Sequence, residues 1–194
     1  MSLTDLDRSL SRAPHLLRTG SSSRRLAAAK ALLEQLALLD ADDRADVDRA
    51  RKLLRVLSLH WSVADAADAA DGVGLAPTVV ELLETCDPPI QMLLVESASQ
   101  LLCGGGSGGS GSGVGHGSGG VEMLVEAYKE LLAADRSFLT PIVGSLSDLP
   151  LSAALKEEVL ALTQVALSLV DEQDVPVVVK ALLSTVTAAT GARV

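Results

Sequence analysis

The sequence is poor in aromatic residues, which make up only 2% of its 194 residues. The three aromatic side chains are Trp61, Tyr128 and Phe138. Hydrophobic residues still reach 48%, so a core can form, and it must be built mainly from Leu, Val and Ala. Each contact between such side chains buries little area, and apolar burial contributes about 25 cal/mol per Å². Such a core needs many contacts, which favours an extended array of helices over one dense centre.

Positive charge is also in short supply. The 25 Asp and Glu residues outnumber the 16 Lys and Arg residues, which gives a net charge of −9. A free-standing DNA-binding domain is usually basic. The balance therefore argues against strong DNA binding by this chain alone, but not against binding through a larger assembly.

Long apolar runs are missing as well. No uninterrupted stretch reaches the roughly 18 residues of a membrane span. The first ten residues carry Asp5, Asp7 and Arg8 without an apolar centre, so we expect no signal peptide. We expect the two cysteines, Cys86 and Cys103, to be reduced core thiols of an intracellular protein, because both fall on apolar faces of expected helices.

What the chain does contain is a 3.6-residue apolar period, which predicts helices and no strand. We expect a short amphipathic stretch over 3–10, a connection over 15–23, and then a series of longer helices. The expected helices cover 23–39, 45–60, 77–86, 89–103, 121–133, 137–146 and 152–170, and a last helix starts at Pro176 with Val175, Val179, Leu182 and Val186 inward.

The expected helix starts have recognisable capping residues. Pro77 and Pro176 open helices, because proline lacks the amide that the first turn leaves unused. Ser152, and Ser22 or Ser23, are expected to cap helices through their side-chain oxygens. Links of 2–6 residues imply antiparallel neighbours. We therefore predict an all-α fold in which antiparallel helical pairs form a HEAT-like α-solenoid segment.

Residues 104–120 are nearly all Gly and Ser, with Val114 and His116 as exceptions. This composition predicts a flexible insertion between helical repeats at 1–103 and 121–194. A phosphate-binding loop is one alternative, but no GxxxxGK[ST] motif is present and no strand precedes the tract. An engineered linker is the other, and the irregular sequence of the tract favours a natural insertion over it. We therefore predict an insertion without a packed core of its own.

The titratable residues do not form a recognisable catalytic or metal-binding pattern. His15, His60 and His116 are far apart in the sequence, and none has metal-ligand spacing to a cysteine or another histidine. The acidic residues between Asp40 and Asp48 lack the spacing of a calcium-binding loop. We therefore expect no enzyme, no cofactor, no metal and no small-molecule substrate.

The candidate interaction surface is basic and lies on the helix expected at 45–60 and at its start. It consists of Arg44, Arg51, Lys52 and Arg55, of which the three arginines fall close to one helix face. Asp48 precedes Lys52 by four residues, so part of this charge is expected to be paired locally. A solvated face, a protein interface and a nucleic-acid contact all stay open at this point.

The C-terminal part of the chain resembles a known family. The residues that carry the resemblance are 141–149 (PIVGSLSDL), a helix ending near Val170, 174–180 (DVPVVVK) and 184–188 (STVTA). They resemble the N-terminal helical region of Fanconi anaemia group D2 proteins. The segments 33–36, 57–61 and 89–91 follow in a compatible order, whereas the Gly/Ser tract departs from the family's pattern.

This resemblance implies an α-solenoid that pairs with the related Fanconi group I protein in the nucleus. The family clamps DNA and is monoubiquitinated during interstrand crosslink repair. The modified lysine lies beyond the matching region, so the resemblance transfers no ubiquitination site to Lys129, Lys156 or Lys180. The chain would then be part of a non-enzymatic repair scaffold. The alternative is an unrelated HEAT- or armadillo-like adaptor.

Overall fold

The computed structural model describes residues 3–19, 21–61, 74–103 and 118–167, together with 172, 175–176, 178–180 and 183. Every regular element within these ranges is a helix, which confirms the predicted all-α class. The α-helices are α1 (Leu3–Arg18), α2 (Ser22–Leu33), α3 (Arg44–His60), α4 (Ala76–Thr85), α5 (Pro88–Cys103), α6 (Ser118–Ala134), α7 (Leu139–Ser147) and α8 (Ala153–Leu167), and two 3₁₀-helices are η1 (Glu34–Leu38) and η3 (Arg136–Phe138).

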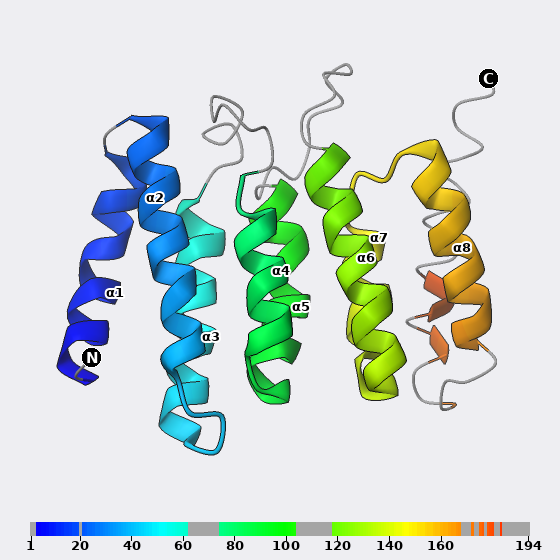
Figure 1. Ribbon diagram of the computed structural model, residues 1–194, viewed down its shortest axis with the longest axis horizontal. Helices are drawn as coiled ribbons and strands as arrows, with labels where there is room; N and C mark the ends of the chain where they lie inside the picture. Colours follow the sequence, from blue (N-terminus) through cyan, green and yellow to red (C-terminus); the bar gives the residue numbers. More distant parts are fainter. Residues whose placement is uncertain are drawn as a thin grey trace.

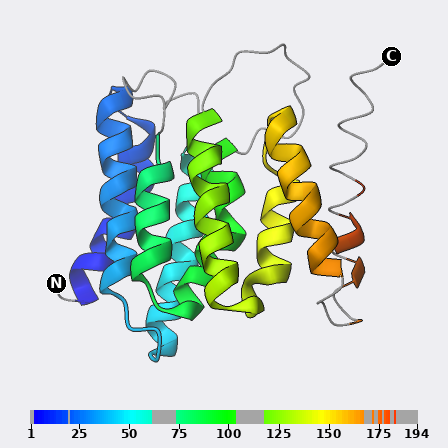
Figure 2. The same ribbon diagram turned by 45° about the vertical axis from the view of Figure 1, so that its right-hand side comes forward.

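The helices pack in two layers. One layer contains α1, α3, α5 and α7, each in contact with the next, and the other contains α2, α4 and α6. Figures 1 and 2 show α4 and α6 in front of α5 and α7, with α8 beyond them. The links α2–α3 and α6–α7 lie at the bottom of Figure 1 and α1–α2 and α7–α8 at the top, so successive helices run antiparallel.

Several helix starts follow the predicted capping chemistry. Pro77 lies in the first turn of α4, and the Ser152 side-chain oxygen accepts a hydrogen bond of 3.3 Å from the Leu155 amide at the start of α8. The Asp43 carboxylate accepts from the Ala45 amide at 2.8 Å, which caps α3. These bonds satisfy amides that the first helical turn leaves unpaired.

The predicted connection at 15–23 is wrong over its first part, because α1 continues to Arg18 with Pro14 inside it. Leu10, Ala13 and Leu17 are buried at spacings of three and four residues. This apolar stripe packs α1 against α2 and α3, and its burial outweighs the backbone hydrogen bond that Pro14 removes. The predicted serine cap of α2 is also wrong, because the cap position is Ser21 and its side chain makes no capping bond.

The end of the Gly/Ser tract differs from the prediction too. Residues 118–120 were expected to be flexible, but they form the first turn of α6, and Gly120 is buried. Glycine has a low helix propensity, so the composition of the tract gives no sign that α6 starts three residues earlier than expected. The rest of the predicted insertion, 104–117, lies outside the described residues.

Of the residues predicted to face inward in the last helix, Val175 is half-buried and Val179 is not buried. Val178 is buried, whereas Val179, which was expected to face inward, is exposed. Three consecutive valines have no polar residue between them. The alternation of apolar and polar residues therefore does not indicate which of the three valines faces the core. Leu182 and Val186 lie outside the described residues.

The core is a continuous band of buried apolar side chains that extends from Leu10 in α1 to Val159 in α8. Ile90, Leu94, Ala98 and Leu101 of α5 are all buried, as predicted. The band contains residues from both predicted helical parts, and α4 contacts α6 while α5 contacts α7. The two parts therefore share one core.

Two buried aromatic residues join neighbouring helices through hydrogen bonds. The Trp61 indole nitrogen donates to the Leu101 carbonyl at 3.1 Å and so joins the end of α3 to the end of α5. The Tyr128 hydroxyl of α6 donates to the Val95 carbonyl of α5 at 3.4 Å and shares a hydrogen bond of 2.9 Å with the Ser145 hydroxyl of α7. These bonds fix the register of the helices that carry the candidate site.

Cys86 is a buried thiol at the end of α4. Burial, together with the nearby Asp87 carboxylate, raises the pKa of this thiol to about 11. The thiol is therefore protonated near neutral pH and has little nucleophilic character. The prediction of a core thiol is confirmed for Cys86, whereas the side chain of Cys103 is not described.

Candidate interaction surface

The four predicted basic residues lie on α3, and all of them are exposed. Arg44 begins the helix, and Arg51 and Arg55 follow seven and eleven residues later. At 3.6 residues per turn, these spacings place the three arginines on one face, and Lys52 is on the flank of that face. The structure therefore brings the predicted residues onto one side of a single helix.

Asp48 pairs with a different residue from the one predicted. Its carboxylate lies 2.8 Å from the Arg51 guanidinium, three residues away, and not against Lys52. Both side chains are about 60% exposed, so solvent screens the pair and its contribution to stability is small. Among the described residues, no ion pair involves Arg44, Lys52 or Arg55. Most of the positive charge on this face is therefore available to a partner.

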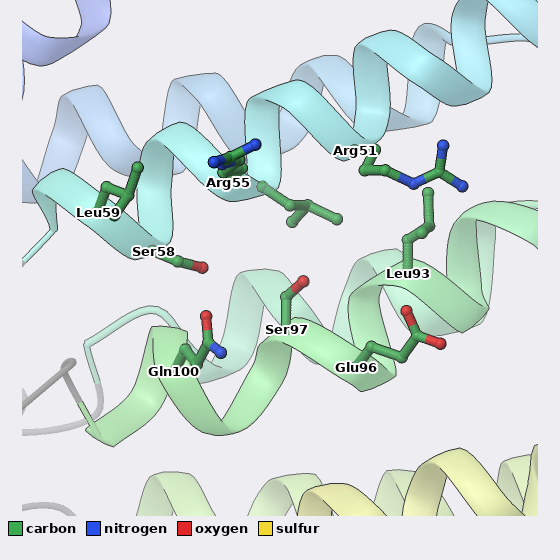
Figure 3. A pocket seen from close by; sticks show the side chains of 9 residues that line it. Arg51, Arg55, Ser58, Leu59, Leu93, Glu96, Ser97 and Gln100 are labelled. Atoms are coloured by element: carbon green, nitrogen blue, oxygen red, sulfur yellow. The ribbon is translucent and has the colours of Figure 1, made fainter. Parts of the chain in front are cut away.

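Arg51 and Arg55 line a groove between α3 and α5 (Figure 3). The groove encloses about 510 Å³. Figure 3 shows Glu96, Ser97 and Gln100 on the α5 wall that faces the arginines. Arg44 and Lys52 are not among the lining residues, so the groove uses half of the predicted surface.

We call this the α3–α5 groove. Its bottom and one of its ends are apolar. Leu54 is buried and Leu93 is half-buried, whereas Leu59 is 66% exposed at the end of α3. The groove thus combines an exposed leucine at one end with two arginine side chains along the same wall, and apolar area together with arginine is typical of protein interfaces. Arginine in particular binds carboxylates and phosphates in a bidentate manner.

The α5 wall was not predicted from the sequence. Its polar residues, Glu96, Ser97 and Gln100, lie opposite the buried stripe of the same helix. Their spacing of one and four residues marks a solvent face, which is the only signal that the sequence offers for them. This face of α5 lies next to α3 because the two helices pack together. The residues of α5 alone do not indicate that α3 is the neighbour.

Of the three histidines considered for chemistry, His60 has a structural contact. The Arg18 guanidinium donates to the Nδ1 atom of His60 at 3.1 Å, which joins α1 to α3. His15 is exposed near the end of α1, and His116 lies outside the described residues. No three His, Cys, Asp or Glu side chains come together as a metal site in the part of the chain that is described.

The acidic residues around the start of α3 form hydrogen bonds with the loop that precedes it. The Asp46 carboxylate is buried, accepts from the Asp40 amide at 3.1 Å and pairs with Arg49. The hydrogen bond from the Asp40 amide, assisted by Arg49 and opposed by burial, lowers the pKa of Asp46. Asp40 in turn accepts from the Asp42 amide at 2.9 Å. Hydrogen bonds within the chain therefore engage the carboxylates of Asp40, Asp43 and Asp46.

A search of the described helices for a membrane span finds none of sufficient length and hydropathy.

Comparisons with protein-family models, curated proteins and solved structures found no match to this chain. The resemblance to Fanconi group D2 proteins therefore rests on residues of the sequence. Of these, 141–149 form most of α7 and the turn after it, while only 175–176 and 178–180 of the segment 174–180 are described.

Proposed function

We propose that this chain is a non-enzymatic helical-repeat scaffold, a HEAT-like α-solenoid segment that binds other macromolecules along its outer helix faces. The observation that supports this is the two-layer stacking, in which α3 contacts α5, α4 contacts α6 and α5 contacts α7. Stacked helical pairs have extended outer surfaces, which repeat proteins use for binding.

The specific form of the proposal is the N-terminal part of a Fanconi group D2-like protein. Such a protein pairs with the group I protein in the nucleus and acts in the DNA damage response by repairing interstrand crosslinks. The amino-acid sequence of residues 141–149, 174–180 and 184–188 supports this specific proposal. An unrelated HEAT- or armadillo-like adaptor is the alternative, and the experiment below separates the two.

The α3–α5 groove is the proposed contact surface for the partner. Arg51 and Arg55 supply donors on one wall, Glu96 supplies an acceptor on the other, and Leu59 supplies exposed apolar area. A groove with both charge signs at its rim selects a complementary protein surface better than a uniformly basic face does.

Co-expression with the cognate Fanconi group I protein tests the pairing. We expect the two proteins to co-purify, and we expect the double variant Arg51→Glu/Arg55→Glu to weaken the complex by at least about tenfold, because it places carboxylates opposite the partner's acceptors. The matched control is Arg24→Glu/Arg136→Glu, which reverses two exposed charges outside the groove. Affinity is measured by biolayer interferometry.

Two outcomes of this binding experiment would contradict different parts of the proposal. A folded, helical sample that fails to bind the group I protein contradicts the repair scaffold and leaves the adaptor. Binding that is equally weakened by the control pair contradicts the assignment of the contact to the α3–α5 groove.

DNA binding by the isolated chain is expected to be weak and sensitive to salt. The net charge is −9, and only a few exposed cations gather on α3. Each phosphate contact releases counterions, so binding through few contacts should be lost by about 200 mM salt. Fluorescence anisotropy with a labelled duplex measures this. Tight binding that persists above that salt concentration contradicts the proposal that DNA is bound through the larger assembly.

A further inference from the structure

A second groove lies on the opposite layer of the molecule, over α4, α6 and the start of α8. It encloses about 720 Å³. Its lining comes mainly from α6, with Val80 and Glu84 from α4 and Leu155 from α8. We call it the α6 groove. It shares no lining residue with the α3–α5 groove.

The rim of the α6 groove is acidic. Glu84, Glu122, Glu126 and Glu130 line it and are all exposed. Lys129 is the only cation of α4 and α6, and it is already paired with Glu126 at 2.8 Å and with Glu158 of α8. Glu84, Glu122 and Glu130 form no ion pair with any residue in the described part of the chain.

The floor of the α6 groove is apolar and open. Gly119, Met123 and Ala127 follow one another at four-residue spacing along α6. Met123 is 39% exposed, and a Cβ atom added at Gly119 would meet no atom within 4 Å. Methionine is common where a surface adapts to different partners. Ala127 is buried, so the exposed area of the strip lies at Gly119 and Met123, where a second helix can cover it.

The two rows on α6 have the same period. The apolar strip runs through 119, 123 and 127, and the acidic row runs beside it through 122, 126 and 130. Rows at four-residue spacing are the ridges and grooves through which helices pack against one another. A helix laid along the strip would place its apolar side chains on the floor and its flanking residues beside the glutamates.

From these two rows we propose that the α6 groove docks a basic amphipathic helix of a partner protein. Charge complementarity identifies the occupant, because lysine or arginine on the helix flank would pair with Glu122 and Glu130. A nucleic acid would bring phosphates against these carboxylates and be repelled. This docking surface is separate from the proposed α3–α5 contact.

The probe for this proposal is a synthetic amphipathic helix of about 18 residues built from lysine and leucine, a length long enough to form a helix on a surface. A scrambled peptide of the same composition has the same charge but no apolar face. We expect the full chain to bind the amphipathic peptide at least about tenfold more tightly than the scrambled one, as measured by fluorescence anisotropy.

Three variants locate the binding site. Glu122→Lys/Glu130→Lys should weaken peptide binding by at least about tenfold. Gly119→Trp should also weaken it, because the new side chain fills the floor while every glutamate is retained. The matched control, Glu81→Lys/Glu157→Lys, makes the same change in net charge at exposed positions outside the groove and should stay within about twofold of the wild type. Circular dichroism verifies that each variant is folded.

Three results would overturn the proposal. The first is that Glu81→Lys/Glu157→Lys weakens peptide binding as much as Glu122→Lys/Glu130→Lys does, which would mean that only the net charge of the chain matters. The second is equal binding of the scrambled peptide. The third is self-association in sedimentation experiments that Arg51→Glu/Arg55→Glu abolishes, since this would make a second copy the occupant. The peptide test is independent of the group I pairing, because Arg51 and Arg55 do not line the α6 groove.

Discussion

Replacing Trp61 with alanine is expected to lower the free energy of unfolding by about 3–5 kcal/mol, the usual cost of removing a large buried aromatic side chain. Trp61 follows the last residue of α3 and is only 4% exposed. Its indole nitrogen donates to the Leu101 carbonyl, which is among the last four carbonyls of α5. Those carbonyls have no partner within their own helix, so the indole caps α5 as well as filling the core. Urea unfolding followed by circular dichroism measures the loss.

Two further substitutions separate the contributions of Trp61. Trp61→Phe keeps most of the apolar volume but leaves the Leu101 carbonyl without its donor, so a loss of about 1–3 kcal/mol is expected. Leu59→Ala, two residues earlier, removes a side chain that is 66% exposed and should change stability by less than about 0.5 kcal/mol. A cost below about 1 kcal/mol for Trp61→Ala would mean that this residue does not hold α3 against α5.

Trp61 also shows why the helices were predictable from the sequence. It ends the predicted stripe of Val47, Ala50, Leu54, Leu57 and Trp61, whose members are spaced by three or four residues. Val47 is half-buried and the other four are buried. Helix starts such as Pro77 and Ser152 were equally readable, because capping depends on residues within one turn of the chain. Local chemistry therefore predicted most of the elements.

One of the wrong predictions concerns a position where packing from elsewhere in the chain decides. Pro14 disfavours a helix interior locally, but Leu17 beyond it is buried, so tertiary contact extends α1 through the proline. The early start of α6 at Ser118 has no local signal, because the two glycines of its first turn have a low helix propensity. The pattern of apolar residues along the sequence does not indicate which helices pack against one another.

The candidate site was predictable only in part, for a related reason. Arg51 and Arg55 stand out as charges on one helix face, but their facing wall, with Glu96 and Gln100, depends on how α3 meets α5. The acidic row of the α6 groove has a regular four-residue spacing, but glutamates on a helix usually indicate a solvated face. Only the apolar strip beside the row gives that spacing a functional meaning.

The second large effect concerns Tyr128, whose hydroxyl is buried among α5, α6 and α7. Burial raises the pKa of this hydroxyl, and the hydrogen bond with Ser145 opposes the rise only in part. An acidic group whose pKa is higher in the folded state contributes stability below its unfolded pKa, about 10 for tyrosine, and loses that contribution as pH rises above it. We therefore expect the wild type to lose up to about 1.4 kcal/mol per pH unit more than Tyr128→Phe above about pH 10.

The Tyr128→Phe comparison isolates the tyrosine from other groups that titrate at high pH. Cys86, with its pKa raised to about 11, loses its proton in the same range, but it does so in both proteins and cancels from the difference. Tyr128 is the single tyrosine of the sequence, so the ultraviolet absorbance of tyrosinate follows its ionisation directly. We expect tyrosinate to form together with the loss of helical circular dichroism, because the hydroxyl ionises only when α5, α6 and α7 separate. Ionisation that precedes unfolding, with parallel stability curves for wild type and variant, would show that water reaches this hydroxyl in the folded protein.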